Sequence, residues 1–263
     1  MNFSKKSFVK TISLFLLVFC FAISSTLSAR DYYQLKVYTI KDKGQELSVD
    51  TYLKNAFLPA MHRAGVKQVG VFKPIADDKA AGTKIFVFIP VKKLDDIVKL
   101  EDKLAKDDVY LKAGAEYINA PYNNPPYERI QSILIKAFKQ LPEFYTPTYT
   151  TPKSEQIYEL RSYEGATEKI WKKKVEMFDE AGEVELFKKL EFNAVFYGEV
   201  VSGAAMPNLM YMTTFKDMKS HDEHWDTFRN HPDWKKLSGM QEYKNTVSHS
   251  DKWLMHPAEY SDI

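Results

Sequence analysis

The stretch that decides the fold is residues 157–165, which read Ile-Tyr-Glu-Leu-Arg-Ser-Tyr-Glu-Gly, because the chain contains an earlier version of it. Residues 33–40 read Tyr-Gln-Leu-Lys-Val-Tyr-Thr-Ile. When Tyr33 is set on Tyr158, the two stretches share the pattern Tyr, Gln or Glu, Leu, Lys or Arg, and a second tyrosine two positions later. Internal similarity of this kind indicates a structural unit that occurs twice.

The earlier copy opens a predicted unit with the order strand, helix, strand, strand, helix, strand. Alternating apolar residues identify its strands, and apolar residues spaced three and four apart identify its helices. The predicted elements are a strand over 33–38, a helix over 46–63 that ends at Gly65, strands over 66–72 and 84–91, a helix over 94–115 and a strand over 129–138.

The later copy opens a second unit with the same order. Ser220 and Glu223 form a capping-box pattern, which predicts the start of its second helix. The expected elements are a strand over 157–163, a helical stretch over 167–190 interrupted near Gly182, strands over 192–200 and 209–215, a helix over 220–243 that pauses at 231–232, and a strand over 251–255. The predicted fold class is therefore α+β, with two ferredoxin-like (βαββαβ) units in tandem that pair like a symmetric dimer.

The segment between the two units is a predicted linker. Residues 141–156 contain three prolines among several threonines and serines, a composition that disfavours both helix and central strand. The predicted organisation is a signal peptide over 1–29, a diverged first unit over 30–140, this linker over 141–156 and a second unit over 157–263.

Residues 1–29 have the pattern of an export signal. A basic start with Lys5, Lys6 and Lys10 precedes an apolar run over 12–23, and small residues then allow cleavage before Arg30. An uncleaved anchor is the alternative, and the run is short for a membrane span. Cys20 follows large residues, which argues against a lipid anchor. We therefore expect a periplasmic or secreted protein of the Gram-negative type, with no membrane attachment after cleavage.

Composition excludes several classes of site. Cys20 is the one cysteine in the sequence, so the mature chain has no disulfide, thiol nucleophile or thiolate metal site. The whole chain has 37 basic and 35 acidic residues, and three of its lysines lie in the signal. A balanced mature chain gives no electrostatic reason to expect nucleic acid as a partner.

The second unit resembles the NIPSNAP family. The resemblance starts with the opening strand and is carried through several spaced motifs, whereas the first unit is similar only in plan and has no tryptophan before Trp171. The motifs are Tyr-Glu-Leu-Arg-Ser-Tyr over 158–163, Val-Phe-Tyr-Gly-Glu over 195–199, Met-Pro-Asn-Leu-Met-Tyr-Met over 206–212, His224-Trp225 with Phe228, and Pro-Asp-Trp-Lys over 232–235.

This resemblance implies a dimeric α/β barrel, in which two four-stranded sheets face each other around a cavity. It implies no particular reaction. Relatives in the superfamily include cofactor-free monooxygenases, haem-handling enzymes and isomerases, so the fold alone does not fix the function.

One polar strand face is the first candidate site. Glu159, Arg161 and Tyr163 alternate along a strand and so share a face, where Arg161 could bind a carboxylate and Tyr163 could donate to an oxygen. The equivalent positions of the first unit, Gln34, Lys36 and Tyr38, are also polar, as in a shared internal lining. The alternative is a solvated face or a structural ion pair.

Histidines of the second unit form the next candidate. His221 and His224 lie at helical spacing, and His231 follows after one bend. We expect no metal site, because no cysteine or carboxylate stands at a recognised ligand spacing. His224 is the best single candidate for an acid, a base or an axial haem ligand, although no haem is required by the sequence. A packed or surface imidazole is the alternative.

Large aromatic residues form the last candidate. Trp225, Phe228 and Trp234 recur at helical spacing, which favours a core position. A stacking surface for an aromatic ligand is the alternative.

Three functions remain open at this stage. The leading interpretation is a module that binds a small apolar or aromatic molecule between its two sheets, lined by Glu159, Arg161, Tyr163, Trp225, Phe228, Trp234, Lys36 and Tyr38. The second is a cofactor-free or haem-dependent oxidoreductase that uses Arg161, Tyr163 and His224. The third is an envelope protein-interaction module, and the pseudo-dimer is free to associate further.

Overall fold

The computed structural model describes residues 29–263, so the predicted signal segment and Cys20 lie outside the described residues apart from Ala29. Within the described residues, no helix has both the length and the apolar character needed to cross a membrane.

The first unit follows the predicted order, with its helices divided into shorter pieces. Gly65 ends α2 in the left-handed conformation (φ 102°), which glycine adopts without strain, as the sequence predicted. Its elements are β1 (Tyr32–Thr39), α1 (Lys43–Tyr52), a π-helical turn η1 (Leu53–Phe57), α2 (Leu58–Ala64), β2 (Gly70–Pro74), β3 (Lys84–Val91), α3 (Leu94–Leu104), α4 (Asp108–Ala113), α5 (Ala115–Ile118) and β4 (Arg129–Ala137).

The second unit repeats that order. Its elements are β5 (Ile157–Glu164), α6 (Glu168–Asp179), α7 (Glu183–Lys189), β6 (Ala194–Ser202), β7 (Asn208–Phe215), α8 (Met218–Asn230), α9 (Pro232–Gly239), a 3₁₀ turn η2 (Gln241–Tyr243) and β8 (His249–Pro257). The predicted start of α8 at Ser220 is wrong. Asp217 is the N-cap, and its carboxylate accepts from the backbone N–H of Ser220, which therefore lies inside the helix.

The eight strands form one closed antiparallel barrel in the order β1-β3-β2-β8-β5-β7-β6-β4. Each unit supplies four neighbouring strands in the ferredoxin-like order, and the units join at two seams, β2 with β8 and β4 with β6. The structure therefore confirms an α+β fold of two tandem ferredoxin-like units that form a pseudo-dimeric barrel. Closure leaves no free sheet edge among these strands.

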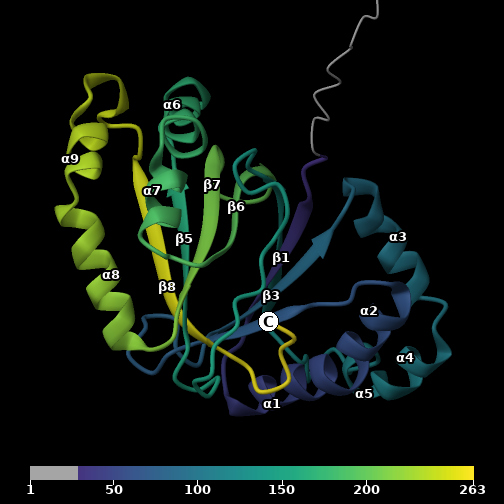
Figure 1. Ribbon diagram of the computed structural model, residues 1–263. Helices are drawn as coiled ribbons and strands as arrows, with labels where there is room; N and C mark the ends of the chain where they lie inside the picture. The colour runs from purple at the N-terminus through teal and green to yellow at the C-terminus, as the bar shows by residue number, and fades with distance from the viewer. Residues whose placement is uncertain (1–28) are drawn as a thin grey trace, which may run out of the picture.

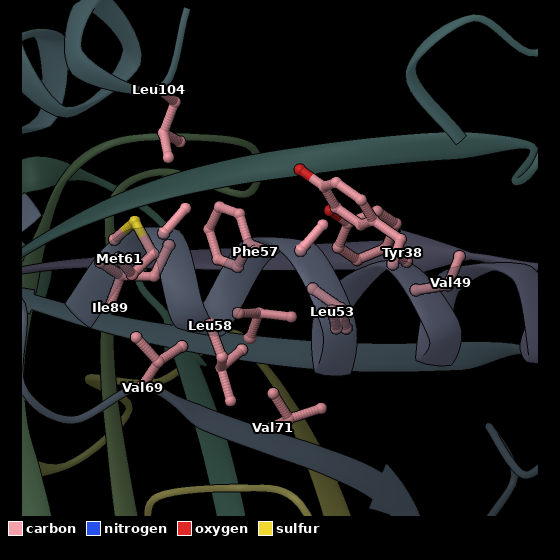
Figure 2. Packing of buried hydrophobic residues seen from close by; sticks show 14 of the residues in the cluster. Tyr38, Val49, Leu53, Phe57, Leu58, Met61, Val69, Val71, Ile89 and Leu104 are labelled. Carbon is pink, nitrogen blue, oxygen red and sulfur yellow. The ribbon is translucent and has the colours of Figure 1, made fainter. Parts of the chain in front are cut away.

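Helices cover the outer surface of the barrel. Figure 1 shows α6–α9 along the strands of the second unit and α1–α5 along those of the first. Between the first sheet and its helices lies a continuous apolar core, in which Leu53, Phe57 and Leu58 pack against Val71 and neighbouring strand residues (Figure 2). Most of the first sheet is therefore buried on both faces.

The barrel interior is filled by side chains. Tyr33, Phe88 and Phe196 are fully buried there, with ring centroids 5.1–5.3 Å apart. Leu160 and Met212 from the second unit belong to the same apolar cluster. Inward-facing aromatic, aliphatic and methionine side chains thus fill the space between the two sheets. The predicted location of a ligand cavity in that space is therefore wrong.

The linker 141–156 contains neither helix nor strand, and it runs along the body of the protein. The Asp31 backbone N–H donates to Pro142, and the Tyr145 N–H donates to Val195 (2.8 and 2.9 Å). Phe144 packs on Phe88 near one end of the barrel (ring centroids 6.1 Å). These contacts attach the linker to both units.

We predict that Gly198→Ala weakens the β4–β6 seam. An added Cβ at Gly198 would lie 2.4 Å from a methyl carbon of Ile135 and 2.7 Å from the Lys136 carbonyl oxygen. Backbone at the seam cannot move away cheaply, so the free energy of unfolding should fall by about 2 kcal/mol in urea denaturation.

Gly239→Ala is the matched control, because nothing lies within 4 Å of its added Cβ. It should change stability by less than about 0.5 kcal/mol. Equal stability of the two variants would contradict the close packing of this seam.

Candidate functional site

The polar face of β5 points outward, beneath the helices of the second unit. Arg161 Nε donates to Glu159 Oε1 (2.9 Å), and its terminal nitrogen donates to the Tyr163 hydroxyl (3.0 Å). The Arg161 guanidinium also lies over the ring of Trp225, 3.8 Å from its centroid. The structure thus brings together Glu159, Arg161, Tyr163 and Trp225, as the sequence predicted, but it places them outside the barrel interior.

Glu159 is the centre of this group, because its fully buried carboxylate accepts from three side chains. Besides Arg161, the Trp225 indole N–H donates to Oε2, and His221 Nε2 lies 3.2 Å from the same oxygen. Burial alone would raise the pKa of Glu159, but the His221 hydrogen bond and the Arg161 charge outweigh it and hold that pKa below the ordinary value of 4.5. Glu159 is therefore an ionised anchor.

The network continues into the helix layer through residues that the sequence analysis missed. The Tyr163 and Tyr211 hydroxyls are 2.9 Å apart. Lys174 pairs with Glu183 (2.7 Å), both nearly inaccessible, and its ammonium lies 5.5 Å from the centre of the Tyr163 ring. Burial raises the pKa of Glu183, and Lys174 opposes that rise. Tyr211 lies in an apolar run and Glu183 lies among other charged residues, so no local pattern marks either as a partner of β5.

The equivalent face of the first unit also lies beneath helices. Gln34 donates to the Ser132 hydroxyl (2.8 Å), and Tyr38 and Tyr117 hydroxyls are 3.4 Å apart. Lys36 lies over Phe57, 5.6 Å from the ring centre, and burial lowers its pKa. The two polar faces therefore do not form one shared internal lining. Each belongs to its own sheet–helix layer.

The three predicted ring systems of the second unit lie in that layer as core. Phe228 packs against Trp234 with ring centroids 4.5 Å apart, and against Phe187 at 4.7 Å. Trp225 and Phe228 meet edge to face at 5.6 Å. These rings contact one another, so the arrangement supports the core interpretation.

The three histidines predicted as a candidate group lie in different surroundings. His221 joins Glu159, whereas His231 accepts from the Asp233 N–H at the start of α9 (3.1 Å). His224 contacts Ser220 on its own helix and lines a small pocket at the foot of the second unit. None of the contacts described for His224 is with Arg161 or Tyr163, so the three proposed catalytic residues do not converge.

A group of potential metal ligands lies at the rim of the barrel. Oxygen or nitrogen atoms of Glu164, His249 and Asp251 are within 4.8 Å of one another. Lys79 is paired with Asp251 at 2.5 Å, so its ammonium already supplies a cation to this group. In the described part of the chain, no other such group occurs.

The first unit contains a pocket with an apolar floor and a basic rim, which we call the lysine-rimmed pocket. Its volume is about 420 Å³, and it lies where the end of β3 meets α3 and the turn after α2. Apolar side chains form the floor, exposed lysines surround the opening, and one of the two aspartates, Asp31, is buried. The floor is Ala64, Val66, Pro90, Val91, Leu100 and Phe144, and the charged residues are Lys67, Lys92, Lys99, Lys103, Asp31 and Asp96.

Four lysines and two aspartates line this pocket, and two of the lysines, Lys67 and Lys103, form no ion pair among the described residues. Lys92 pairs with Asp31 (3.1 Å) and with Glu143 (3.2 Å), and Lys103 donates to the Ala64 carbonyl (2.9 Å). No ion pair is described for Lys67, and Lys99 pairs with Asp95 outside the pocket (2.5 Å). A pocket of this size and composition matches the usual small-molecule site, in which apolar walls supply area and a few polar groups orient the ligand.

The closed barrel of paired ferredoxin-like units defines a protein of the dimeric α/β-barrel class. Residues 158–262 match the NIPSNAP family model, so the chain carries a NIPSNAP domain. That span covers nearly all of the second unit, from the polar strand β5 to the segment after β8.

Several solved structures are similar to the chain, and the first two below share its fold. A candidate monooxygenase from Fusobacterium nucleatum is 10% identical, with 88% of this chain and 93% of that chain covered and a TM-score of 0.55. A candidate monooxygenase from Lactobacillus acidophilus is 12% identical, with 87% and 94% covered and a TM-score of 0.52. A NIPSNAP family protein from Agrobacterium tumefaciens is 15% identical, with 41% and 98% covered and a TM-score of 0.37. No curated protein matches the chain.

We predict that Glu159→Gln lowers the free energy of unfolding by about 3 kcal/mol at neutral pH, because Arg161 then loses its buried counter-charge. The loss should shrink on acidification. Since the folded-state pKa of Glu159 lies below 4.5, its ionised form stabilises the protein above 4.5, and that stabilisation is lost as the pH falls through the folded-state pKa.

Urea denaturation of both proteins between pH 3 and pH 7 measures this difference. Glu183 titrates in both proteins, so its contribution cancels. Glu185→Gln, an exposed site on α7, is the control and should give no pH-dependent difference. A constant gap between wild type and Glu159→Gln across this range would show that Glu159 does not act as an ionised anchor.

Proposed function

We propose that this protein binds a small amphipathic anion, with an aromatic or aliphatic body and one acidic group, in the lysine-rimmed pocket. The observation that carries the proposal is the combination of an apolar floor with an excess of lysine at its opening. The apolar body would replace water on Val66, Leu100 and Phe144, and the acidic group would lie among the lysines.

The position of the lysine-rimmed pocket also supports its role as the binding site. Phe144 belongs to the linker and forms part of the pocket floor, while it packs on Phe88 at the end of the barrel. A ligand would therefore contact α3, β3 and the linker together. The polar network of Glu159 and Arg161, in contrast, has its groups paired with one another, which suits a structural role.

An oxidoreductase is the second candidate, and its support is the fold. The neighbours with TM-scores of 0.55 and 0.52 are described as candidate monooxygenases, and a third, with a TM-score of 0.50, as anthrone oxidase-like. Sequence identities of 9–12% support a shared fold but assign no role to any residue. Dioxygen consumption by the purified protein with aromatic ligands of the pocket tests this candidate.

The N-terminal sequence supports export as a further part of the proposal. The basic start and apolar run of residues 1–23 fit a signal that directs the chain out of the cytoplasm. Intact mass of the protein recovered from its own cells tests cleavage before Arg30.

We predict that 1-naphthoate binds more tightly than 1-naphthylmethanol, which has the same ring system without the charge. Lys67→Glu should weaken naphthoate binding about fivefold and leave naphthylmethanol nearly unchanged, because it reverses one charge of the rim. Val66→Trp should weaken both compounds by filling the floor. Isothermal titration calorimetry at two salt concentrations measures the affinity of each protein for both compounds.

Lys188→Glu, an exposed charge reversal on α7 of the other unit, is the matched control and should leave both affinities unchanged. If Lys188→Glu lowered naphthoate affinity as much as Lys67→Glu does, the net charge of the protein, and not the charge at the pocket, would explain the loss. Binding that survives Val66→Trp would place the ligand elsewhere.

A further inference from the structure

A second, smaller pocket lies in the other unit, at the lower end of β7 and the start of α8. It has a volume of about 230 Å³, and polar groups outnumber apolar ones in its wall. The lining residues are Tyr149, Glu191, Asn193, Thr214, Phe215, Lys216, Ser220 and His224. We call it the His224 pocket. Its size is below that of drug-sized sites, so it suits a ligand of few heavy atoms.

His224 lines this pocket, and a hydrogen bond on its own helix fixes one of its two ring nitrogens. Its Nδ1 lies 2.7 Å from the Ser220 carbonyl oxygen, which can only accept, so Nδ1 carries the proton and donates. In the neutral ring, Nε2 therefore keeps a lone pair, and no partner is described for it. The rings of Phe192 and Phe215 lie edge-on to the imidazole at 5.8 and 5.5 Å and fix its plane.

The opposite wall is held by a hydrogen-bonded group. Thr214 Oγ1 donates to the Asn193 carbonyl (2.8 Å), so the Tyr149 hydroxyl, 2.9 Å away, donates to Thr214 Oγ1. Asn193 Nδ2 in turn donates to the Tyr149 oxygen (3.3 Å). Glu191 and Asn193 have φ of 58° and 40°, a left-handed conformation that asparagine tolerates and that costs energy for Glu191. The wall is thus a defined structure that includes the linker residue Tyr149.

The charges at the opening select the ligand. Lys216 and Glu191 are both exposed side chains that line the pocket, one positive and one negative. Lys216 attracts a carboxylate, whereas Glu191 repels a second one. The lone pair of His224 Nε2 requires a hydrogen-bond donor, which a hydroxyl group supplies. The ring of Phe215 provides an apolar surface for a short carbon chain.

We propose that the His224 pocket binds a small monocarboxylic hydroxy acid. The hydroxyl group donates to His224 Nε2, and the carboxylate pairs with Lys216. This site is separate from the lysine-rimmed pocket, since the two share no lining residue and belong to different units. The proposal therefore stands or falls independently of the proposed function.

Titration with three anions tests the proposal on mature protein labelled with ¹⁵N-histidine. L-lactate should bind and shift the Nε2 resonance of His224. Propionate lacks the hydroxyl, and malate has a second carboxylate, so each should bind at least fivefold more weakly. His224→Gln and Lys216→Gln should each lower lactate affinity about tenfold. His249→Ala, an exposed histidine of the same unit, should leave it unchanged.

Thermal denaturation of each variant separates lost binding from lost folding, and Lys188→Glu, an exposed charge reversal on α7, should leave lactate affinity unchanged. Equal affinity for lactate and propionate would overturn the role of His224. Undiminished lactate binding in His224→Gln, or no shift of the His224 resonance at saturating lactate, would overturn the site itself.

Discussion

The pairing of strands across two seams is the interaction on which the rest of the structure depends. A four-stranded sheet has two edges with unpaired N–H and C=O groups, and here each edge is paired with an edge of the other unit. The β2–β8 seam is short and includes Pro74 and Pro257, which cannot donate. The chain after β8 extends it, because the N–H groups of Ala258 and Asp262 donate to Val71 and Val69. Closure fixes the interior, the outer helices and therefore both pockets.

Sequence alternation predicted which residues share a strand face, but not the direction of that face. Glu159, Arg161 and Tyr163 do lie together, as their spacing required, and Trp225 joins them. Their shared face predicts a cavity lining, because convergent polar groups are one mark of a ligand pocket. In a barrel covered by helices most strands, β5 among them, are largely buried on both faces, so polarity alone cannot identify the inward one. The large side chain of Tyr33 and its apolar neighbours fill the interior, and this packing determines which strand face points inward.

Other differences arise where non-local groups compete with local patterns. Ser220 and Glu223 match a capping box, yet Asp217 precedes them and caps the helix three residues earlier. The linker contributes Phe144 to one pocket and Tyr149 to the other. Its proline-rich sequence has no periodicity that would show which side chains face the protein. The element order, which depends on local periodicity, was predictable, whereas both pockets depend on contacts between distant segments.

Covalent connection of the two units changes how the barrel responds to dilution. If the halves were separate chains, the seams would form by a bimolecular reaction, and the folded fraction would fall with protein concentration. Here the linker is attached to both halves through Asp31 and Val195, so each half meets the other at a fixed effective concentration. A fused barrel can therefore persist at low abundance. It also allows the halves to diverge, since Gln34 and Lys36 no longer need to match Glu159 and Arg161.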